Sequence, residues 1–360
     1  MNRYELTITK VEALTHDSKA LYFDFNDNIP SVLPGQFLTF LLDINDKEVR
    51  RSYSLCTFGD EQLGVGVKKV PGGIASTYLN TRVRKGMKVS VLAPSGNFTF
   101  NAKTDEAQSL LLVAGGSGIT PMLAIMKSAL LQTEKSVTLI YINKSQQDVM
   151  FLQELEEWTL NYSERLNIEY YFDDLHTKTI EVKKPGILGW LRPKEQKTSP
   201  GFINPDRFSA LLNKNNLDLP HSKAYLCGPT GLMDMVFDHL MVKGMPKNHI
   251  LREQFVSQLP INPKPNFKPP ECDANIELYG EKHLVKIPSG VNVLQAAIEA
   301  GIDMPFSCRE GTCTACYSTC KSGEVSMLTD KSLTDEELKS GGFLPCVSFP
   351  KSKVLNIVIE

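Results

Sequence analysis

Four cysteines near the carboxyl end of this 360-residue chain have the spacing of an iron–sulfur site. Three of them follow the pattern C-x4-C-x2-C, and a solitary fourth comes later, as in the plant-type [2Fe–2S] sites where four thiolates hold two iron atoms. A structural zinc site would normally use two paired cysteine knuckles, and a dithiol switch would need only the closest pair. Cys320 is expected to be an ordinary buried thiol. The predicted cluster ligands are Cys308, Cys313, Cys316 and Cys346.

A second group of residues could hold a nucleotide through its phosphates. In the sequence Arg51-Ser-Tyr-Ser54, the arginine can pair with phosphate in a bidentate manner and Tyr53 offers a flat face to a ring. Further along, two glycines lead into a short predicted helix, whose first N–H groups can bind a pyrophosphate. This turn consists of Gly72, Gly73, Ile74, Ala75 and Ser76. Together the two motifs predict a flavin nucleotide site.

Two further loops could bind a nicotinamide nucleotide. The first has the sequence AGGSGITP, follows a predicted buried strand and opens a helix, so its glycines admit a phosphate or ribose. Its candidate residues are Gly115, Gly116, Gly118 and Pro121. The second loop is Cys227-Gly228-Pro229, at the carboxyl end of a later strand, where a nicotinamide ring would be expected.

The residues after the next predicted strand bear on the choice of nucleotide. Asn143 ends this strand, and Lys144 and Ser145 follow it. No acidic residue stands where a ribose 2′-hydroxyl is usually bound, and Lys144 and Ser145 could instead contact a 2′-phosphate. This pattern favours NADPH slightly, with NADH as the alternative.

The elements that must position these residues fall into three predicted domains. Residues 1–103 contain six short β runs separated by turns, which predicts an antiparallel six-stranded flavin-binding barrel. Residues 104–255 alternate apolar strands with helices, which predicts an α/β nucleotide-binding domain with a parallel sheet. Residues 256–274 contain five prolines and are expected to form a linker. Residues 275–360 carry the cysteine loop and resemble an α+β, β-grasp-like ferredoxin domain.

Composition and charge limit the possible partners. The chain has 39 Lys and Arg against 41 Asp and Glu, so its net charge of −2 provides no general attraction for nucleic acid. The uncharged run 108–126 is interrupted by GGSG and Pro121, which predicts strand, turn and helix rather than a membrane span. The first residues lack a secretory pattern, so we expect a cytoplasmic protein. Residues 174–200 are expected to form a basic loop, with peripheral contact to a partner or membrane as an alternative.

Taken together, the nucleotide motifs resemble the ferredoxin–NADP⁺ reductase superfamily. The likeness rests on Arg51-Ser-Tyr-Ser54, Gly73-x-x-Ser76, Gly116-Ser-Gly118-Ile-Thr-Pro121, Cys227-Gly-Pro229 and Glu253-Gln-Phe255. The cysteine loop resembles a plant-type ferredoxin. The order of reductase followed by ferredoxin resembles the reductase components of phenylacetyl-CoA epoxidase and related oxygenases, and the likeness covers the chain outside residues 174–200.

This resemblance implies roles for individual residues. Arg51 would hold the flavin pyrophosphate, Tyr53 would pack on the isoalloxazine, and Ser54 would hydrogen-bond to its N5 atom. Further flavin contacts would come from Val67, Lys68, Ile74, Ala75 and Ser76. Thr120 and Cys227 would flank the nicotinamide, Phe255 would cover the flavin, and Glu253 would lie nearby. The expected catalytic residues are Ser54, Cys227 and Glu253.

The resemblance also implies an electron-transfer enzyme. Hydride would pass from NADPH or NADH to the flavin, and single electrons would pass through the cluster to a separate acceptor protein. The expected acceptor is an oxygenase, a hydroxylase or a desaturase. The expected flavin is FAD, with FMN as the alternative because phthalate-dioxygenase-reductase-like enzymes share this domain order. A redox-sensing module without turnover is the alternative function.

Overall fold

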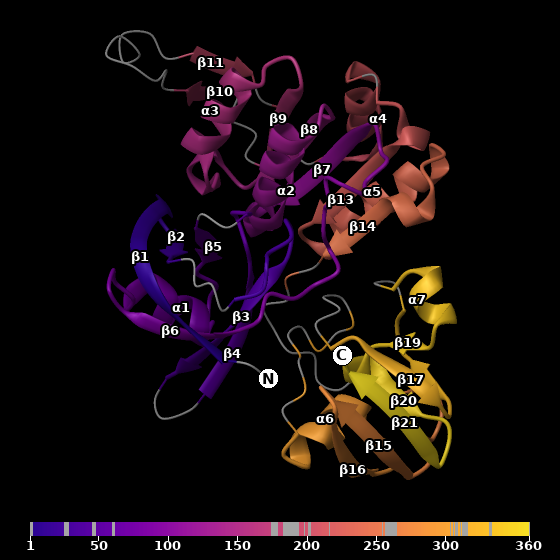
Figure 1. The fold of residues 1–360 in the computed structure, drawn as a ribbon. Helices are drawn as coiled ribbons and strands as arrows, with labels where there is room; N and C mark the ends of the chain where they lie inside the picture. The colour runs from indigo at the N-terminus through magenta and orange to yellow at the C-terminus, as the bar shows by residue number, and fades with distance from the viewer. Residues whose placement is uncertain are drawn as a thin grey trace. The chain divides into compact units, whose positions relative to one another are not determined.

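The computed structural model describes most of the chain as two compact units, one within residues 3–254 and the other within residues 255–360 (Figure 1). The described residues are 3–24, 29–44, 48–59, 62–173, 179–182, 194–197, 199–200, 203–215, 217–253, 255, 265–302, 304, 306, 309, 311, 316–330 and 333–359. Most of the predicted insertion, residues 256–264 of the predicted linker, and Cys308 and Cys313 lie outside them. None of the described helices is long and apolar enough to span a lipid bilayer.

The amino-terminal part of the first unit is an antiparallel barrel with one helix. Its elements are β1 (Arg3–Thr15), β2 (Ser18–Phe23), β3 (Phe37–Asp43), β4 (Glu48–Ser54), β5 (Leu63–Lys68), α1 (Ile74–Thr81) and β6 (Lys88–Leu92). The six strands are ordered β4-β3-β6-β1-β2-β5. A bridge between Leu55 and Val65 joins the two edge segments and closes the barrel. The predicted six-stranded antiparallel barrel is therefore confirmed.

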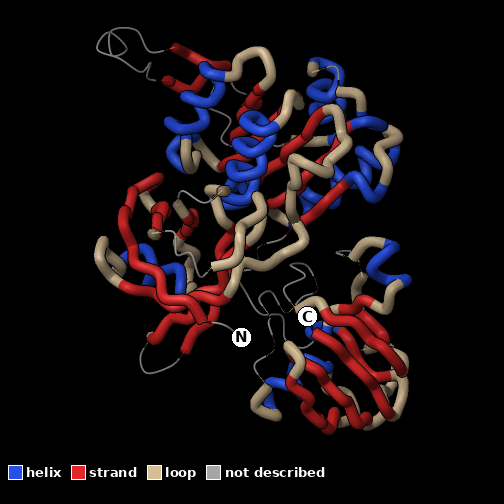
Figure 2. Tube along the Cα trace, in the orientation of Figure 1, coloured by secondary structure: helices blue, strands red, loops and turns tan. Residues whose placement is uncertain are grey.

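The rest of this unit is a parallel sheet covered by helices on both faces, as the alternation of strands and helices predicted (Figure 2). Its elements are β7 (Ser109–Gly115), α2 (Ile119–Gln132), β8 (Ser136–Asn143), α3 (Leu152–Asn161), β9 (Leu166–Phe172), β12 (Ser199–Pro200), α4 (Pro205–Lys214), β13 (Ser222–Cys227), α5 (Thr230–Val242) and β14 (Ile250–Glu253). Alternate residues of β7 explain the layering. Leu110 and Leu112 pack in the core beneath α2 and α3, whereas Leu111 and Val113 pack in the core beneath α4 and α5.

The order of these strands creates a natural ligand site. They are ordered β12-β9-β8-β7-β13-β14, and every neighbouring pair is parallel. The chain runs outward from β7 in one direction and then returns to continue from β13 on its other side. In such open sheets, ligands bind where the order reverses, at the carboxyl ends of the strands. The predicted Gly and Cys-Gly-Pro loops follow β7 and β13.

The barrel and the parallel sheet share a hydrophobic core. Four barrel-side residues belong to the same buried cluster as the apolar face of α2: Ala20, Cys56, Phe98 and Phe100. Within residues 174–200, the described parts form a short hairpin of β10 (Thr179–Val182) and β11 (Lys194–Lys197), and the edge strand β12, where the sequence predicted only a loop.

The second unit contains a mixed sheet with a helix packed against it. Its elements are β15 (Cys272–Leu278), β16 (Glu281–Ile287), α6 (Val293–Glu299), β17 (Ser318–Ser322), β18 (Val325–Met327), α7 (Asp335–Lys339), β19 (Gly342–Phe343), β20 (Ser348–Pro350) and β21 (Val354–Ile359). The main sheet is ordered β16-β15-β21-β17-β19, with β15 and β21 parallel. Residues of α6 pack in one core with the inward faces of these strands, as predicted for a ferredoxin-like domain.

Candidate active site

The loops after β7 and β13 are packed backbone against backbone. A Cβ atom added to Gly118 would lie 2.1 Å from the carbonyl oxygen of Cys227, and one added to Gly115 would lie 2.5 Å from the Cδ atom of Pro229. No side chain fits at such distances, so glycine is required for this close approach. The structure thus brings together the two loops that the sequence predicted as nucleotide-binding, at the point where the strand order reverses.

Tyr141 holds the glycine loop through its side-chain hydroxyl. Its buried hydroxyl donates a 3.1 Å hydrogen bond to the carbonyl oxygen of Gly116 and accepts one of 3.2 Å from the amide of Met150. Thr120 fixes the other side of the loop by donating to the carbonyl oxygen of Ser117 at 3.0 Å. Pro121 lies in the first turn of α2, where its missing N–H costs little. Hydrogen bonds from two side chains therefore hold the backbone of this loop in place.

Cys227 ends β13 next to Glu253 on β14. The two residues are paired in the parallel register, and each side chain is no more than 3% exposed. Burial raises the pKa of the Cys227 thiol well above its usual value, and the Glu253 carboxylate raises it further. The thiol is therefore neutral at physiological pH, and it offers a weak donor and a polarizable surface rather than a nucleophilic thiolate.

Glu253 also reaches the barrel. Its Oε2 atom accepts a 3.1 Å hydrogen bond from the hydroxyl of Ser54 at the end of β4, and both residues are buried. The three residues expected to be catalytic, Ser54, Cys227 and Glu253, are thus neighbours in the fold. They come from three different strands, so only the folded chain assembles them.

Tyr53 and Arg51 lie on β4 beside this contact. The Tyr53 ring packs edge-on against Phe40, with 5.5 Å between ring centroids and 85° between planes. Burial raises the pKa of the Tyr53 phenol strongly, and the charge of the nearby Arg51 opposes this rise only partly. Arg51 itself is exposed, which suits a cation that binds a ligand phosphate.

The predicted pyrophosphate turn is held by Ser76. Its hydroxyl accepts a hydrogen bond from the amide of Val70 at 3.2 Å and donates to the carbonyl oxygen of Gly73 at 3.3 Å. Gly73 precedes α1, and no side chain caps the helix among the described residues. The first amides of α1, at Ile74 and Ala75, are therefore oriented for an anion, while the Ser76 hydroxyl stabilises the turn.

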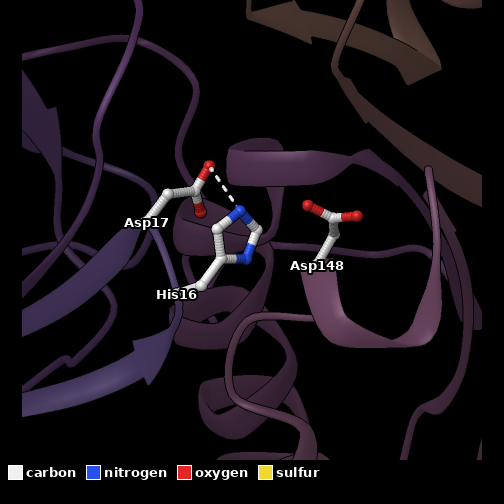
Figure 3. A group of neighbouring side chains, drawn as sticks. All are labelled: His16, Asp17 and Asp148. Atoms are coloured by element: carbon white, nitrogen blue, oxygen red, sulfur yellow. Dashed lines mark ion pairs between the residues drawn. The ribbon is translucent and has the colours of Figure 1, made fainter.

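Lys68, expected at the ribityl chain, lies in a group of charged side chains. Its ammonium is 3.5 Å from Oδ1 of Asp17, in the β1–β2 turn, and 3.4 Å from Oδ1 of Asp148, which follows β8. Figure 3 shows His16 between the two carboxylates, and ligand atoms of His16, Asp17 and Asp148 lie within 4.8 Å of one another. Because the Lys68 ammonium pairs with both carboxylates, we interpret the group as an ion-pair cluster.

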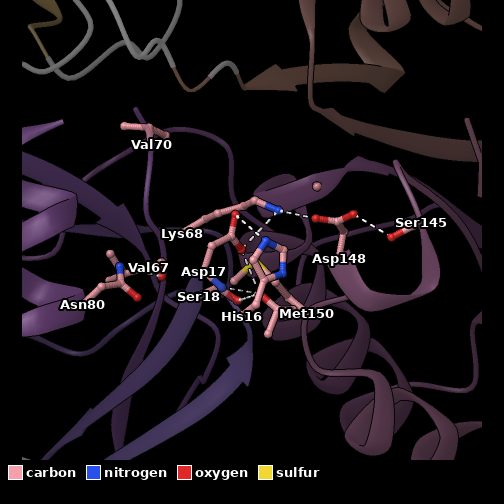
Figure 4. A network of polar contacts seen from close by, with 12 residues as sticks. His16, Asp17, Ser18, Val67, Lys68, Val70, Asn80, Ser145, Asp148 and Met150 are labelled. Atoms are coloured by element: carbon pink, nitrogen blue, oxygen red, sulfur yellow. Dashed lines mark hydrogen bonds and ion pairs between the residues drawn. The ribbon is translucent and has the colours of Figure 1, made fainter. Parts of the chain in front are cut away.

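Ser145 is joined to this cluster (Figure 4). Its hydroxyl donates a 2.8 Å hydrogen bond to Oδ2 of Asp148. Burial opposes ionisation of Asp148, but the Ser145 hydrogen bond and the Lys68 charge outweigh it and lower the Asp148 pKa. Lys144 also has a carboxylate nearby, because its charge partly offsets the burial that raises the Asp173 pKa. The two residues predicted to contact a 2′-phosphate are therefore each beside an acidic side chain.

Two of the four predicted cluster ligands are described. Cys316 and Cys346 are each 3% exposed, are not disulfide-bonded and belong to one hydrophobic core. Gly311 shows that the cysteine loop meets the segment of Cys346, since a Cβ atom on Gly311 would lie 2.8 Å from Cγ2 of Val347. Buried cysteines that form no disulfide and lie on converging segments fit a cluster site.

Two other residues singled out from the sequence are also described. Cys320 is partly exposed, and its thiol contacts the carbonyl oxygen of Ser322 at 3.3 Å. It was expected to be a buried thiol, and its observed partner is the backbone of its own strand. Phe255 is 42% exposed and falls in the second compact unit, so its predicted place over the flavin stays a prediction.

Sequence reasoning missed Asp17, Asp148 and Tyr141. Asp17 and Asp148 stand in short turns, where acidic residues are common and their partners lie far away in the sequence. A usable signal existed only for Tyr141, because a polar hydroxyl inside an otherwise apolar buried strand requires a hydrogen-bond partner.

Family models match each part of the chain. Residues 5–100 match the oxidoreductase FAD-binding domain, residues 112–238 the oxidoreductase NAD-binding domain, and residues 276–351 the 2Fe-2S iron-sulfur cluster binding domain. The chain is 33% identical to the ferredoxin reductase component of 3-ketosteroid-9-alpha-monooxygenase from Mycobacterium tuberculosis, over 99% of this chain and 96% of that protein. The chain belongs to the ferredoxin–NADP⁺ reductase superfamily. In this reductase the 2Fe-2S iron-sulfur cluster binding domain follows the FAD-binding and NAD-binding domains.

Two further relatives extend the likeness. One component of the 1,2-phenylacetyl-CoA epoxidase from Escherichia coli is 30% identical to the reductase over 96% of this chain and 95% of that protein. The solved structure of phthalate dioxygenase reductase has the same fold, with a TM-score of 0.57 and 23% identity over 99% of this chain and 98% of that one. The reductase is therefore an NAD(P)H oxidoreductase that uses FAD and a [2Fe–2S] cluster.

Proposed function

We propose that this reductase passes electrons from a nicotinamide nucleotide to an oxygenase. The observation that carries the proposal is the end-to-end likeness of both compact units to the reductase component of a monooxygenase. A nucleotide unit alone would fit many reductases, but the added ferredoxin unit supplies a one-electron carrier for a protein acceptor. The cytoplasmic location expected from the sequence is part of this proposal.

The described residues fit the cofactors that this function needs. When bound, FAD accepts a hydride from NAD(P)H, and the [2Fe–2S] cluster carries electrons singly. We assign Arg51 and the first amides of α1 to the flavin phosphates, because a guanidinium and an uncapped helix end both bind anions. We assign the half-buried face of Tyr53 to the flavin ring, since the packing of Phe40 fixes that face.

Ser54, Glu253 and Cys227 are the residues that we propose act at the reacting rings. The Glu253 carboxylate fixes the Ser54 hydroxyl through the 3.1 Å hydrogen bond, so the serine oxygen presents a fixed acceptor and polar edge to the flavin. Cys227, as a neutral thiol, provides a surface against which the nicotinamide can lie. Their shared burial excludes water from the place of hydride transfer.

We propose that NADH is the preferred donor, although the sequence pattern favoured NADPH. That pattern rested on the absence of an acidic residue after β8, and the turn of residues 146–148 brings Asp148 back to Ser145. An ionised carboxylate at this position repels a 2′-phosphate and can accept a hydrogen bond from a 2′-hydroxyl. The carboxyl group of Asp173, beside Lys144, likewise disfavours a 2′-phosphate.

The cluster ligands are proposed to be Cys308, Cys313, Cys316 and Cys346. The burial of Cys316 and Cys346 in one core, outside any disulfide bond, supports this assignment.

The proposed function is tested by reconstitution. The purified holoenzyme should oxidise NADH, reduce ferricyanide and cytochrome c, and support substrate oxidation when mixed with a candidate oxygenase partner. The reductase is then omitted from the mixture. Turnover of the oxygenase with NADH alone would refute the proposed role.

A further inference from the structure

Asp17 stands in a turn that neither the family motifs nor the sequence analysis assigned, and it forms the start of a polar chain across the first unit. The chain runs from the β1–β2 turn through Lys68 on β5 to Asp148 and Ser145 after β8 (Figure 4). It therefore connects the barrel with the segment that follows the second strand of the parallel sheet.

Asp17 is held in place from both sides. The hydroxyl of Thr15 donates a 2.8 Å hydrogen bond to Oδ1 of Asp17, and the Asp17 amide donates back to the Thr15 hydroxyl at 3.3 Å. The carbonyl oxygen of Asp17 accepts from the amide of Lys69 at 2.7 Å. The carboxylate therefore meets Lys68 from a turn that is already fixed to the strand bearing that lysine.

Lys68 connects Asp17 with the parallel-sheet side of the unit. Its ammonium lies between Oδ1 of Asp17 and Oδ1 of Asp148, and its side chain is only 22% exposed. The side chains of Asp17 and Asp148 are 25% and 15% exposed, so solvent screens these pairs less than it screens surface pairs. Without Asp17, the long lysine side chain could point to Asp148 from several directions.

Strand β5 is also closely packed against neighbouring residues next to these ion pairs. A Cβ atom on Gly66, two residues before Lys68, would lie 2.6 Å from Cγ2 of Thr120 and 3.1 Å from the ring of Phe151. Phe151 itself has a left-handed backbone, with φ of 60°. Strand β5 therefore contacts the segment after β8 at two points, Asp148 and Phe151, and the Asp17–Lys68 pair sets one of them.

From this geometry we infer that Asp17 is a positioning residue for the nicotinamide nucleotide. Asp17 holds Lys68 against Asp148, and so keeps the turn of residues 145–148 in the position that receives the donor's ribose. This inference rests on the proposed function, because that function places the donor at the carboxyl ends of β7 and β8. Asp17 would affect binding of the donor and would leave the Ser54–Glu253 contact unchanged.

The test compares Asp17→Asn with Glu12→Gln in the full-length holoenzyme. Both changes remove one carboxylate charge from the same edge of the barrel, but Glu12 pairs only with the exposed Lys10 among the described contacts. Ferricyanide reduction is measured against NADH concentration, and flavin content is checked by absorbance. We expect Asp17→Asn to raise the KM for NADH by about fivefold with kcat unchanged, and Glu12→Gln to change neither value.

Thr15→Val provides a second variant that keeps every charge. It removes the hydroxyl that fixes Asp17, so the KM should rise by a smaller factor, about twofold to threefold. The inference is overturned if Asp17→Asn leaves the KM at the wild-type value, if Glu12→Gln raises it equally, or if kcat falls while the KM stays constant. If the wild-type holoenzyme oxidises neither NADH nor NADPH, the proposed function itself fails.

Discussion

Ser54 donates a buried hydrogen bond to Glu253, a residue 199 positions later in the chain. Ser54 ends a strand of the barrel, and Glu253 ends the last strand of the parallel sheet. Glu253 also adjoins Cys227 through strand pairing. A single carboxylate therefore connects the barrel residue expected at the flavin with the sheet residue expected at the nicotinamide.

Replacing Ser54 by Ala should slow hydride transfer. The substitution removes the hydroxyl and leaves the buried Glu253 carboxylate without this donor, so we expect kcat for ferricyanide reduction to fall by about tenfold to a hundredfold. Stopped-flow measurement of flavin reduction by excess NADH checks this step directly. Ser52→Ala is the matched control, because Ser52 lies on the same strand and its hydroxyl pairs with Thr39 at 2.9 Å. Equal rates of flavin reduction in the two variants would contradict a role for Ser54.

Cys227 should be inert toward alkylation at pH 8. Its pKa is raised by burial and by Glu253, so the thiol is protonated at every pH below that raised value and no thiolate is available. Treatment with iodoacetamide should therefore leave hydride transfer intact in a Cys320→Ser background, which removes a partly exposed thiol. Rapid inactivation at pH 8 that NAD⁺ prevents would show instead that Cys227 ionises.

Gly118→Ala should destabilise the nucleotide domain. The added Cβ atom would lie 2.1 Å from the carbonyl oxygen of Cys227, so the two loops must separate. We expect the free energy of unfolding to fall by about 2 kcal/mol or more and donor binding to weaken. Gly231→Ala is the control, since a Cβ atom there has open space on α5 and should change stability by less than about 1 kcal/mol. The temperature at which flavin fluorescence is released compares the stability of the two variants, and the KM for NADH reports donor binding. Similar melting temperatures for the two variants would contradict the close packing.

The parts of the fold that the sequence predicted are those with a local pattern of apolar, polar and turn-forming residues. The six β runs before residue 100 and the strand–helix alternation after it follow from periodicity, and α1 begins at Ile74 as its glycines indicated. Helix α6 and the final strand were equally visible. The hairpin of β10 and β11 was not, because each strand has only four residues and β11 has no apolar residue.

The residues of the candidate site could be predicted from the sequence, but the contacts between them could not. Ser54, Cys227 and Glu253 could each be singled out from motifs, whereas their hydrogen bond and strand pairing depend on how three distant strands meet. Lys68 shows the limit more clearly. The family resemblance implies a place for Lys68 near the ribityl chain, whereas the contacts of its ammonium with Asp17 and Asp148 could not be read from the sequence.

Asp148→Ser should shift donor preference toward NADPH. The carboxylate is held ionised, since its hydrogen bond from Ser145 and the charge of Lys68 lower its pKa despite partial burial. Removing it leaves Lys68 and Lys144 near the site with one fewer negative charge, which favours a 2′-phosphate. We expect the ratio of kcat/KM for NADPH to that for NADH to rise by about tenfold or more.

Steady-state kinetics with both donors measures this ratio. The control is Asp234→Ser, because Asp234 pairs with Arg252 on the other half of the sheet and should leave the ratio unchanged. Wild-type enzyme that already prefers NADPH by more than tenfold would refute the role assigned to Asp148.

Cys346→Ser should separate the two halves of the electron path. Cys346 is buried in the core of the ferredoxin unit, and serine is a poor substitute for a cluster thiolate, so we expect the variant to lose most of its iron. Ferricyanide can take electrons from the flavin directly, so its reduction should continue, whereas cytochrome c reduction should fall by at least about tenfold. Cys320→Ser is the control and should keep both activities and the iron content, because Cys320 lies on β17 with its thiol against the backbone. If Cys346→Ser lost its iron and still reduced cytochrome c at the wild-type rate, the cluster would not lie on the path to that acceptor.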